Sequence, residues 1–328
     1  MDNQAFRSFR GHAQHGVETL TCWGLDLGGT KIEGVILDES KRPIVRERLA
    51  TEQSGGYGHI LTQIERLVRL MSEKSGIEVP ERIGIGSPGR AEGPEGIVKN
   101  SNTVCLNGMP LGRDLRERLG MVVMIENDAN CFVLAESVLG AGRDEMSRPG
   151  TTAFGIIMGT GVGGGIVCDG RLVRGAHGIA GEWGHNPLAG EQEACYCGRR
   201  GCIETVISGP ALERYYTAVS GRMASLAEIA AASGRERAAR LTIDRLVTSF
   251  GRALATVINI LDPDLVIVGG GVGNIRQLYT AEARQAIASH VFNRSFDIPL
   301  LPPLLGDSAG VFGAALLAVP PSAREVRE

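Results

Sequence analysis

Apolar residues along this chain follow two patterns, short continuous runs and longer stretches with helical spacing. Between residues 60 and 71 they occupy positions 60, 61, 64, 67, 68, 70 and 71, which predicts a helix with one buried face. The same reasoning predicts helices over residues 111–119, 129–139, 210–219, 226–232, 238–261, 280–290 and 311–319. Short apolar runs predict strands over residues 21–27, 32–37, 44–49, 82–86, 122–125 and 265–268. Strands that alternate with helices indicate an α/β fold.

One stretch of the chain occurs twice. The sequence GLDLGGTKIEGVILD at residues 24–38 matches GIIMGTGVGGGIVCD at residues 155–169, at a constant offset of 131. Each copy predicts a strand, a glycine turn, a second strand, a tight turn and a third strand. Two copies, each at the head of a half-chain, indicate a duplicated domain. Two similar α/β domains make a cleft between them the expected ligand site.

The expected organisation is therefore two α/β domains. A small N-terminal domain is predicted over residues 21–125, with a C-terminal helix at about 308–319 returning to it, and a larger domain over residues 126–307. Residues 1–20 show no apolar periodicity and are expected to form a flexible extension.

Composition narrows the function classes. Glycine contributes 46 of 328 residues, about twice the usual share, and clusters in loops where backbone could lie close to a ligand. The net charge is −3 with no basic block, which argues against a nucleic-acid or membrane-surface partner. Seven cysteines, and a start without the apolar core of a signal peptide, indicate a reduced, cytoplasmic protein.

Two glycine turns are candidate phosphate sites. The turn in residues 26–31 exposes successive amides that could cradle phosphate oxygens, while Thr30 and Lys31 add a hydroxyl and a positive charge. Asp26 could hold a metal ion through water, although a plain tight turn is an equal alternative. Residues 159–165 satisfy G-x-G-x-x-G, but a strand is predicted after them, which excludes a Rossmann site. The order Thr30-Lys31 excludes a Walker A loop.

The strongest chemical signal is a cluster of metal-binding residue types. His185 precedes three cysteines that fall within eight residues, Cys195, Cys197 and Cys202. Three thiolates and one imidazole suit tetrahedral zinc, so the cluster predicts a structural zinc site. The remaining cysteines are expected to fill the core.

The segment 126–130, Glu-Asn-Asp-Ala-Asn, lies between a predicted strand and a predicted helix. Asn127 or Asp128 could simply cap the helix, and position favours that reading. A carboxylate at the carboxyl end of a strand could also act as a general base on a hydroxyl group.

Together these motifs resemble the repressor–ORF–kinase family of bacterial sugar kinases, over nearly the whole chain from Gly24 to Ala318. The cysteine segment is similar to the family signature C-x-C-G-x-x-G-C-x-E, and residues 182–185 resemble its E-x-G-H element. The resemblance implies a two-domain actin-like or hexokinase-like (ribonuclease H-like) fold with an interdomain cleft.

The resemblance also implies roles for individual residues. Asp128 would be the general base, and ATP, Mg²⁺ and a structural Zn²⁺ would be bound. Sugar hydroxyls would be bound by Asn102, Asn127, Glu182, His185 and Glu204. The nucleotide and magnesium would be bound by Asp26, Gly28, Gly29, Thr30, Lys31, Gly159, Thr160, Gly161, Gly163, Gly164, Gly269, Gly270 and Gly271. Zinc would be bound by His185, Cys195, Cys197 and Cys202. A homodimer is the assembly that the resemblance suggests.

Within the family, several short segments look most similar to bacterial fructokinases. We therefore expect phosphorylation of fructose, and of mannose as a second substrate, to the 6-phosphate. An N-acetylglucosamine kinase or a glucokinase of the same family is the alternative. From other classes, a catalytically silent sugar-binding protein remains open. A repressor is disfavoured, because only twenty-three residues precede Gly24 and a helix-turn-helix module needs some eighty.

Overall fold

The computed structural model describes residues 21–319, which divide into two compact units. The first unit contains residues 21–135 together with 306–319, and the second contains residues 136–305. The sequence-based boundary at 125/126 therefore lies ten residues before the one that packing defines. The expected extension at residues 1–20 lies outside the described residues.

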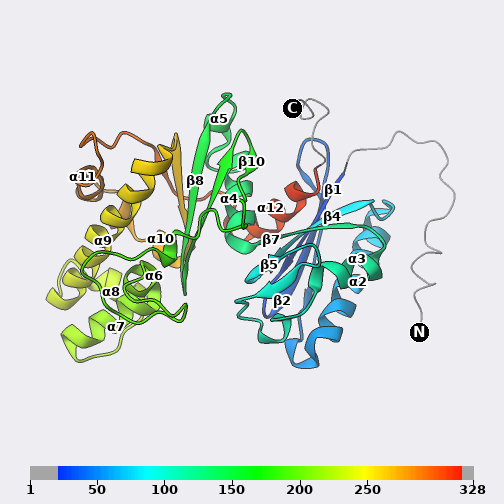
Figure 1. Ribbon diagram of the computed structural model, residues 1–328, viewed down its shortest axis with the longest axis horizontal. Coiled ribbons are helices and arrows are strands. Elements are labelled where there is room, and N and C mark those ends of the chain that lie inside the picture. Colours follow the sequence, from blue (N-terminus) through cyan, green and yellow to red (C-terminus); the bar gives the residue numbers. More distant parts are fainter. Residues whose placement is uncertain (1–20, 320–328) are drawn as a thin grey trace. The chain divides into compact units, whose positions relative to one another are not determined.

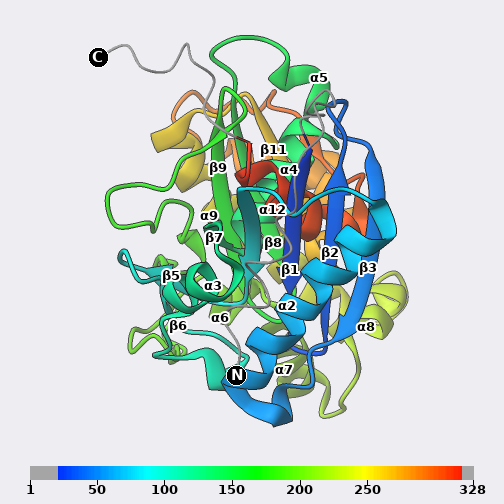
Figure 2. The same ribbon diagram turned by 90° about the vertical axis from the view of Figure 1, so that its right-hand side faces the viewer.

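A five-stranded mixed sheet forms the centre of the first unit, in the order β3-β2-β1-β4-β7. Its strands are β1 (Cys22–Leu27), β2 (Lys31–Leu37), β3 (Pro43–Ala50), β4 (Arg82–Ser87) and β7 (Val122–Asn127). Short turns make β1, β2 and β3 antiparallel neighbours, whereas β4 and β7 run parallel to β1. Figure 2 shows β1, β2 and β3 side by side with α2 (Gly56–Ser75) crossing them.

One face of this sheet is covered by α2 and α3 (Leu111–Leu119). The buried face of α2 carries Ile60, Ile64 and Leu67, in agreement with the apolar spacing of the sequence. These side chains pack with Trp23 and Leu25 of β1 in a core that excludes solvent.

The other face is covered by α12 (Ala309–Leu317), which lies beside β1 and β4 (Figure 1). The approach is too close for side chains on the sheet: a Cβ on Gly84 would lie 1.8 Å from the Ala314 carbonyl oxygen. The same helix packs on α4 (Asp128–Val138), where a Cβ on Gly313 would lie 1.8 Å from the Cys131 carbonyl oxygen. This contact explains why the first turns of α4 belong to the first unit.

The second unit has its own five-stranded sheet, in the order β10-β9-β8-β11-β12. Its strands are β8 (Thr152–Met158), β9 (Val162–Cys168), β10 (Arg171–Leu172), β11 (Leu265–Gly269) and β12 (Leu300–Leu301). β8, β9 and β10 are antiparallel and β11 runs parallel to β8, which repeats the arrangement of β1, β2, β3 and β4. The predicted duplication is thus present in the backbone.

Helices of the second unit surround the long helix α9 (Arg237–Leu261). Its buried residues include Phe250 and Leu254, which lie in one core with Phe154 of β8. Its neighbours are α7 (Gly209–Ser220), α8 (Leu226–Ala232) and α11 (Ala281–Ala288).

Shorter elements complete the described chain. They are η1 (Gln53–Gly55), β5 (Arg90–Glu92), β6 (Ile97–Lys99), η2 (Val104–Leu106), α5 (Arg143–Met146), η3 (Trp183–His185), α6 (Glu204–Ile207), α10 (Gly270–Gly273), η4 (Arg276–Tyr279) and η5 (Gly306–Ser308). The β5–β6 hairpin was not predicted, and α10 makes a helical turn where a glycine turn was expected. Among residues 21–319, no helix has both the length and the apolar character that a membrane crossing requires.

Candidate active site

The first glycine turn is a tight hairpin between β1 and β2. The Gly28 amide donates to the Lys31 carbonyl oxygen at 2.9 Å, which closes the turn. Thr51, directly after β3, holds the hairpin from the side, because its Oγ1 donates to the Gly28 carbonyl oxygen at 2.6 Å. Its amide also donates to the Thr30 carbonyl oxygen at 3.0 Å. Thr30 and Lys31 remain exposed, as a phosphate-binding turn requires.

Asp26 lies one residue before the end of β1, beside this hairpin. Burial raises the pKa of its carboxyl group to about 6, and the charges of Asp128 and Glu33 add to the rise, while Lys31 opposes it. A cation bound here would relieve this electrostatic cost. Carboxylate oxygens are the ligands that Mg²⁺ prefers, so the residues present suit that ion.

The start of α4 shows which side chain caps the helix. Asn127 makes the helix cap, because its Oδ1 accepts from the Asn130 amide at 2.7 Å. Asn130 is itself fixed by its side-chain amide, which donates to Glu126 Oε2 at 3.0 Å. Asp128 accepts from the adjacent Ala129 amide at 2.9 Å and keeps solvent-accessible surface, while desolvation by the surrounding protein raises the pKa of its carboxyl group. The cap uses Oδ1 of Asn127, and none of the described hydrogen bonds uses its Nδ2 group.

Asn102 is exposed on the loop between β6 and η2. The loop is braced by Asn107, whose Oδ1 accepts from the Ser101 amide at 2.8 Å and whose Nδ2 donates to the Ser101 carbonyl at 2.9 Å. The next residue, Thr103, is fully buried, and its Oγ1 would lie 3.5 Å from a Cβ on Gly29. The loop that presents Asn102 therefore packs against the first hairpin.

The second glycine turn connects β8 to β9 within the second unit. The Gly159 amide donates to the Gly161 carbonyl oxygen at 2.9 Å. The Gly159 carbonyl accepts from the Gly209 amide, at the start of α7, at 2.8 Å. On the other side, the Val162 amide donates to Glu204 Oε2 at 2.9 Å.

Gly270 lies next to this hairpin. Its φ of 80° is a conformation that favours glycine, and a Cβ there would lie 2.3 Å from the Met158 carbonyl oxygen. The expected nucleotide-binding glycines of the second unit thus gather at one end of its sheet, where β8 and β11 finish.

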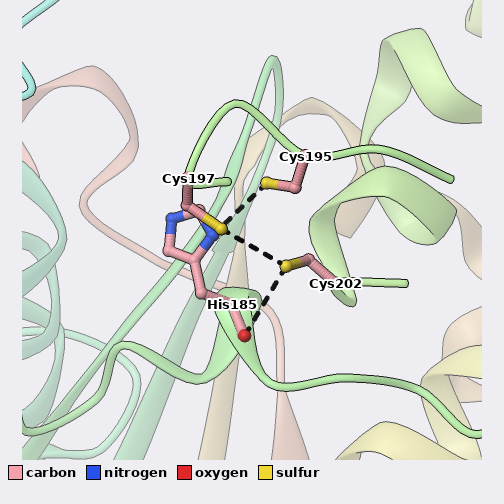
Figure 3. A group of neighbouring side chains, drawn as sticks. All are labelled: His185, Cys195, Cys197 and Cys202. Carbon is pink, nitrogen blue, oxygen red and sulfur yellow. Dashed lines mark hydrogen bonds between the residues drawn. The ribbon is translucent and has the colours of Figure 1, made fainter. Parts of the chain in front are cut away.

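The side chains of His185, Cys195, Cys197 and Cys202 converge, as Figure 3 shows. Their candidate ligand atoms all lie within 4.8 Å of one another. Cys197 Sγ is 3.6 Å from Cys202 Sγ, and Cys195 Sγ is 3.7 Å from His185 Nδ1. A tetrahedral zinc with ligand distances near 2.3 Å would separate its ligands by roughly 3.7 Å, so this donor set fits zinc.

Backbone hydrogen bonds hold together the loop that carries this cluster. The Leu188 amide donates to the Gly201 carbonyl at 2.7 Å, and the Ile203 amide donates to the Asn186 carbonyl at 3.0 Å. The loop is also packed against β9, because Trp183 Nε1 donates to the Gly163 carbonyl at 3.0 Å.

Tyr196 is a residue that sequence reasoning missed. Its hydroxyl lies 3.1 Å from His185 Nε2, and the two rings meet edge to face with centroids 5.3 Å apart. The tyrosine is 74% exposed. The only signal in the sequence was its position between two predicted ligands, which by itself says nothing about where the ring points.

Comparison with known proteins identifies the family. The family model described as "ROK family" matches residues 22–320. The chain belongs to the ROK family. An N-acetyl-D-glucosamine kinase of Pectobacterium carotovorum subsp. carotovorum is 35% identical over 310 residues, which cover 90% of this chain and 98% of the relative.

Solved ROK structures share the fold. A ROK hexokinase from Thermus thermophilus superposes with a TM-score of 0.82 at 31% identity, over 91% of this chain and 98% of that one. A ROK family glucokinase from Streptomyces griseus, solved with glucose and AMPPNP, gives 0.70 at 29% identity, over 91% and 99%. The expected α/β fold of the hexokinase-like type is confirmed.

The expected residues of this ROK protein fall into two groups. The first unit brings together Asp26, Asp128 and the hairpin at residues 28–31. The second unit brings together the hairpin at residues 159–162, Glu204 and the group of His185, Cys195, Cys197 and Cys202, called the metal-type cluster below. Glu182 joins that group as the residue before η3.

Proposed function

We propose that this ROK protein is an ATP-dependent sugar kinase with Asp128 as its general base. The observation that carries the proposal is the exposed Asp128 carboxylate at the start of α4, where Asn127 has taken over the cap. During transfer, the sugar oxygen bonds to the γ-phosphorus and its proton passes to Asp128. The bond from the γ-phosphorus to the bridging oxygen breaks, and its electron pair leaves with ADP.

The remaining residues would position the two substrates. The Gly28, Gly159 and Val162 amides are used within the protein, so the amides of Gly29, Thr30, Thr160 and Gly161 would donate to phosphate oxygens. Gly269–Gly271 would lie beside the adenosine. Mg²⁺, held by Asp26, would supply charge neutralisation on the phosphates. Asn102, Asn127 Nδ2, Glu182, His185 and Glu204 would hydrogen-bond to the sugar.

Two lines of support point to different sugars. The N-acetyl-D-glucosamine kinase relative, at 35% identity, favours N-acetyl-D-glucosamine. The segments 98–103, 184–188 and 203–209, which resemble fructokinases, favour fructose. Identity near 30% does not separate sugars, since a glucokinase solved with glucose matches over the same share of this chain. We take N-acetyl-D-glucosamine as the first substrate to test and fructose as the second.

Zinc at the His185–Cys202 cluster would have a structural role in this function. The donor set and its spacing of 3.6–3.7 Å support zinc. By holding the loop after β10, the cluster would present Glu182 and Glu204 to the sugar without taking part in phosphoryl transfer.

The deciding experiment is ADP release from Mg·ATP with N-acetyl-D-glucosamine, fructose, mannose and glucose assayed in parallel. Turnover with one of them supports the kinase and names its sugar by the largest kcat/KM. Sugar binding without turnover of any of the four would contradict the kinase and favour a sugar-binding protein. Since a hydroxyl difference in a pocket built to bind it changes kcat/KM by orders of magnitude, the ranking is expected to be clear.

A further inference from the structure

Glu204 lies in the second unit between two parts of the candidate site, the second glycine hairpin and the cysteine loop. It begins α6, two residues after Cys202 of the metal-type cluster. Its Oε2 accepts a hydrogen bond from the Val162 amide at 2.9 Å, across 42 residues of sequence. The family resemblance assigns this side chain to the sugar, yet one of its oxygens is committed to the glycine hairpin.

The hairpin is shaped to admit this carboxylate. A Cβ on Gly161 would lie 2.6 Å from Glu204 Oε2, closer than a real side chain tolerates. The Gly209 amide, five residues after Glu204, bonds the Gly159 carbonyl at 2.8 Å. The segment 204–209 therefore holds both ends of the hairpin.

The segment before Glu204 is also fixed. The Ile203 amide donates to the Asn186 carbonyl at 3.0 Å, and Cys202 pairs with Pro187 as an isolated antiparallel bridge. Gly184 completes the packing, because a Cβ there would lie 2.0 Å from the Val162 carbonyl oxygen. The chain around the cysteine loop thus contacts both backbone groups of Val162: Gly184 packs on its carbonyl oxygen, and Glu204 accepts from its amide.

We propose that Glu204 is a positioning residue for nucleotide binding, which sets the conformation of the hairpin at residues 159–162 and links it to the cysteine loop. The proposal rests on the proposed function, in which this hairpin binds ATP phosphates. A carboxylate beside a phosphate would normally repel it. Here the Val162 amide donates to one oxygen and offsets part of that charge, so the carboxylate fixes the hairpin while its other oxygen is left for the sugar.

The test is calorimetric binding of Mg·AMPPNP to the full chain without sugar. Glu204→Ala removes the acceptor, so its Kd for the nucleotide is expected to rise about tenfold or more, as for the loss of a hydrogen bond to a charged group. Glu204→Gln keeps an acceptor oxygen and is expected to stay within about threefold of the wild type. Glu193→Ala is the matched control, an exposed glutamate of the same loop, and should bind like the wild type.

Gly161→Ala gives an independent check that leaves Glu204 in the chain. The added methyl group displaces the carboxylate from Val162, so nucleotide binding should weaken as in Glu204→Ala. If Glu204→Ala does not fold, wild-type nucleotide binding by Gly161→Ala still contradicts the inference. Nucleotide binding at wild-type strength in these variants, with only sugar binding weakened, would overturn the inference and leave Glu204 a sugar ligand alone. Absence of nucleotide binding to the wild type would instead overturn the kinase itself, and this inference with it.

Discussion

The two glycine hairpins have the same backbone plan and different supports. The first is braced by Thr51, 23 residues from Gly28, which directly follows β3 of the same sheet. The second is braced by Glu204, 42 residues from Val162, which begins α6 directly after the loop that carries the metal-type cluster. The first hairpin has charged neighbours of its own, Asp26 and Lys31. Duplication thus preserved the turn, while the surroundings of each copy became different: Asp26 and Lys31 lie beside the first, whereas Glu204 and the loop with the metal-type cluster hold the second.

The largest effect is expected at Asp128, which lies in the first unit near the first hairpin. Asp128→Asn removes the proposed proton acceptor while keeping the size of the side chain, and asparagine is also a good residue at a helix start. We expect kcat to fall by about a thousandfold or more, with sugar binding retained. The rate of ADP release gives kcat, and calorimetry on the same preparation gives the Kd for the sugar. A variant that keeps more than a tenth of wild-type kcat would exclude Asp128 as the base.

Removal of zinc from the metal-type cluster is expected to destabilise the loop next to the second hairpin. Elemental analysis is expected to find about one zinc per chain, and a chelator or Cys197→Ser should lower the melting temperature and loosen the loop that holds Glu204. Because Cys105 is a thiol away from the cluster, Cys105→Ser is the control and should retain zinc. Protein that melts at the same temperature with and without chelator would contradict a structural zinc.

Much of this arrangement follows from the sequence. Helices such as α8 and α3 have the predicted bounds, since their apolar spacing and flanking residues agree. The duplicated strands were found by their shared pattern. The metal-type cluster was found because its four residues lie close in sequence.

What the sequence did not provide depends on contacts between distant segments. The β5–β6 hairpin has only three residues in each strand, too few for a periodic signal. The bond from Val162 to Glu204 and the contact of Tyr196 with His185 are decided by how loops pack, which no local pattern records. The assignment of the cap to Asn127 and not to Asp128 needed the side-chain direction at the start of α4.

A smaller effect is expected from Asp26, and it depends on pH. Its folded-state pKa is about 6 against 3.8 for the free group, so its contribution to stability is fully present below pH 3.8 and is lost as the pH rises through 6. Asp26→Asn should therefore be more stable than the wild type at pH 7.5, by roughly 1–3 kcal/mol, and about equal at pH 4. Thermal melting of both proteins across this range measures the difference. Added Mg²⁺ should stabilise the wild type and not the variant, and equal responses would contradict magnesium binding at Asp26.

The smallest effect tests the brace of the first hairpin. Thr51→Val keeps the shape of a fully buried side chain but removes the hydroxyl that donates to the Gly28 carbonyl at 2.6 Å. Leaving that carbonyl without its partner should cost about 1–2 kcal/mol in the free energy of unfolding, measured in urea. Thr62→Val is the matched control, since the Thr62 hydroxyl bonds a carbonyl on the exposed side of α2 at 3.1 Å and its loss should cost less than about 0.5 kcal/mol. Because Thr51 lies in the first unit and Glu204 in the second, Thr51→Val should leave zinc content unchanged, whereas a loss of zinc would show that the two hairpins are not braced independently.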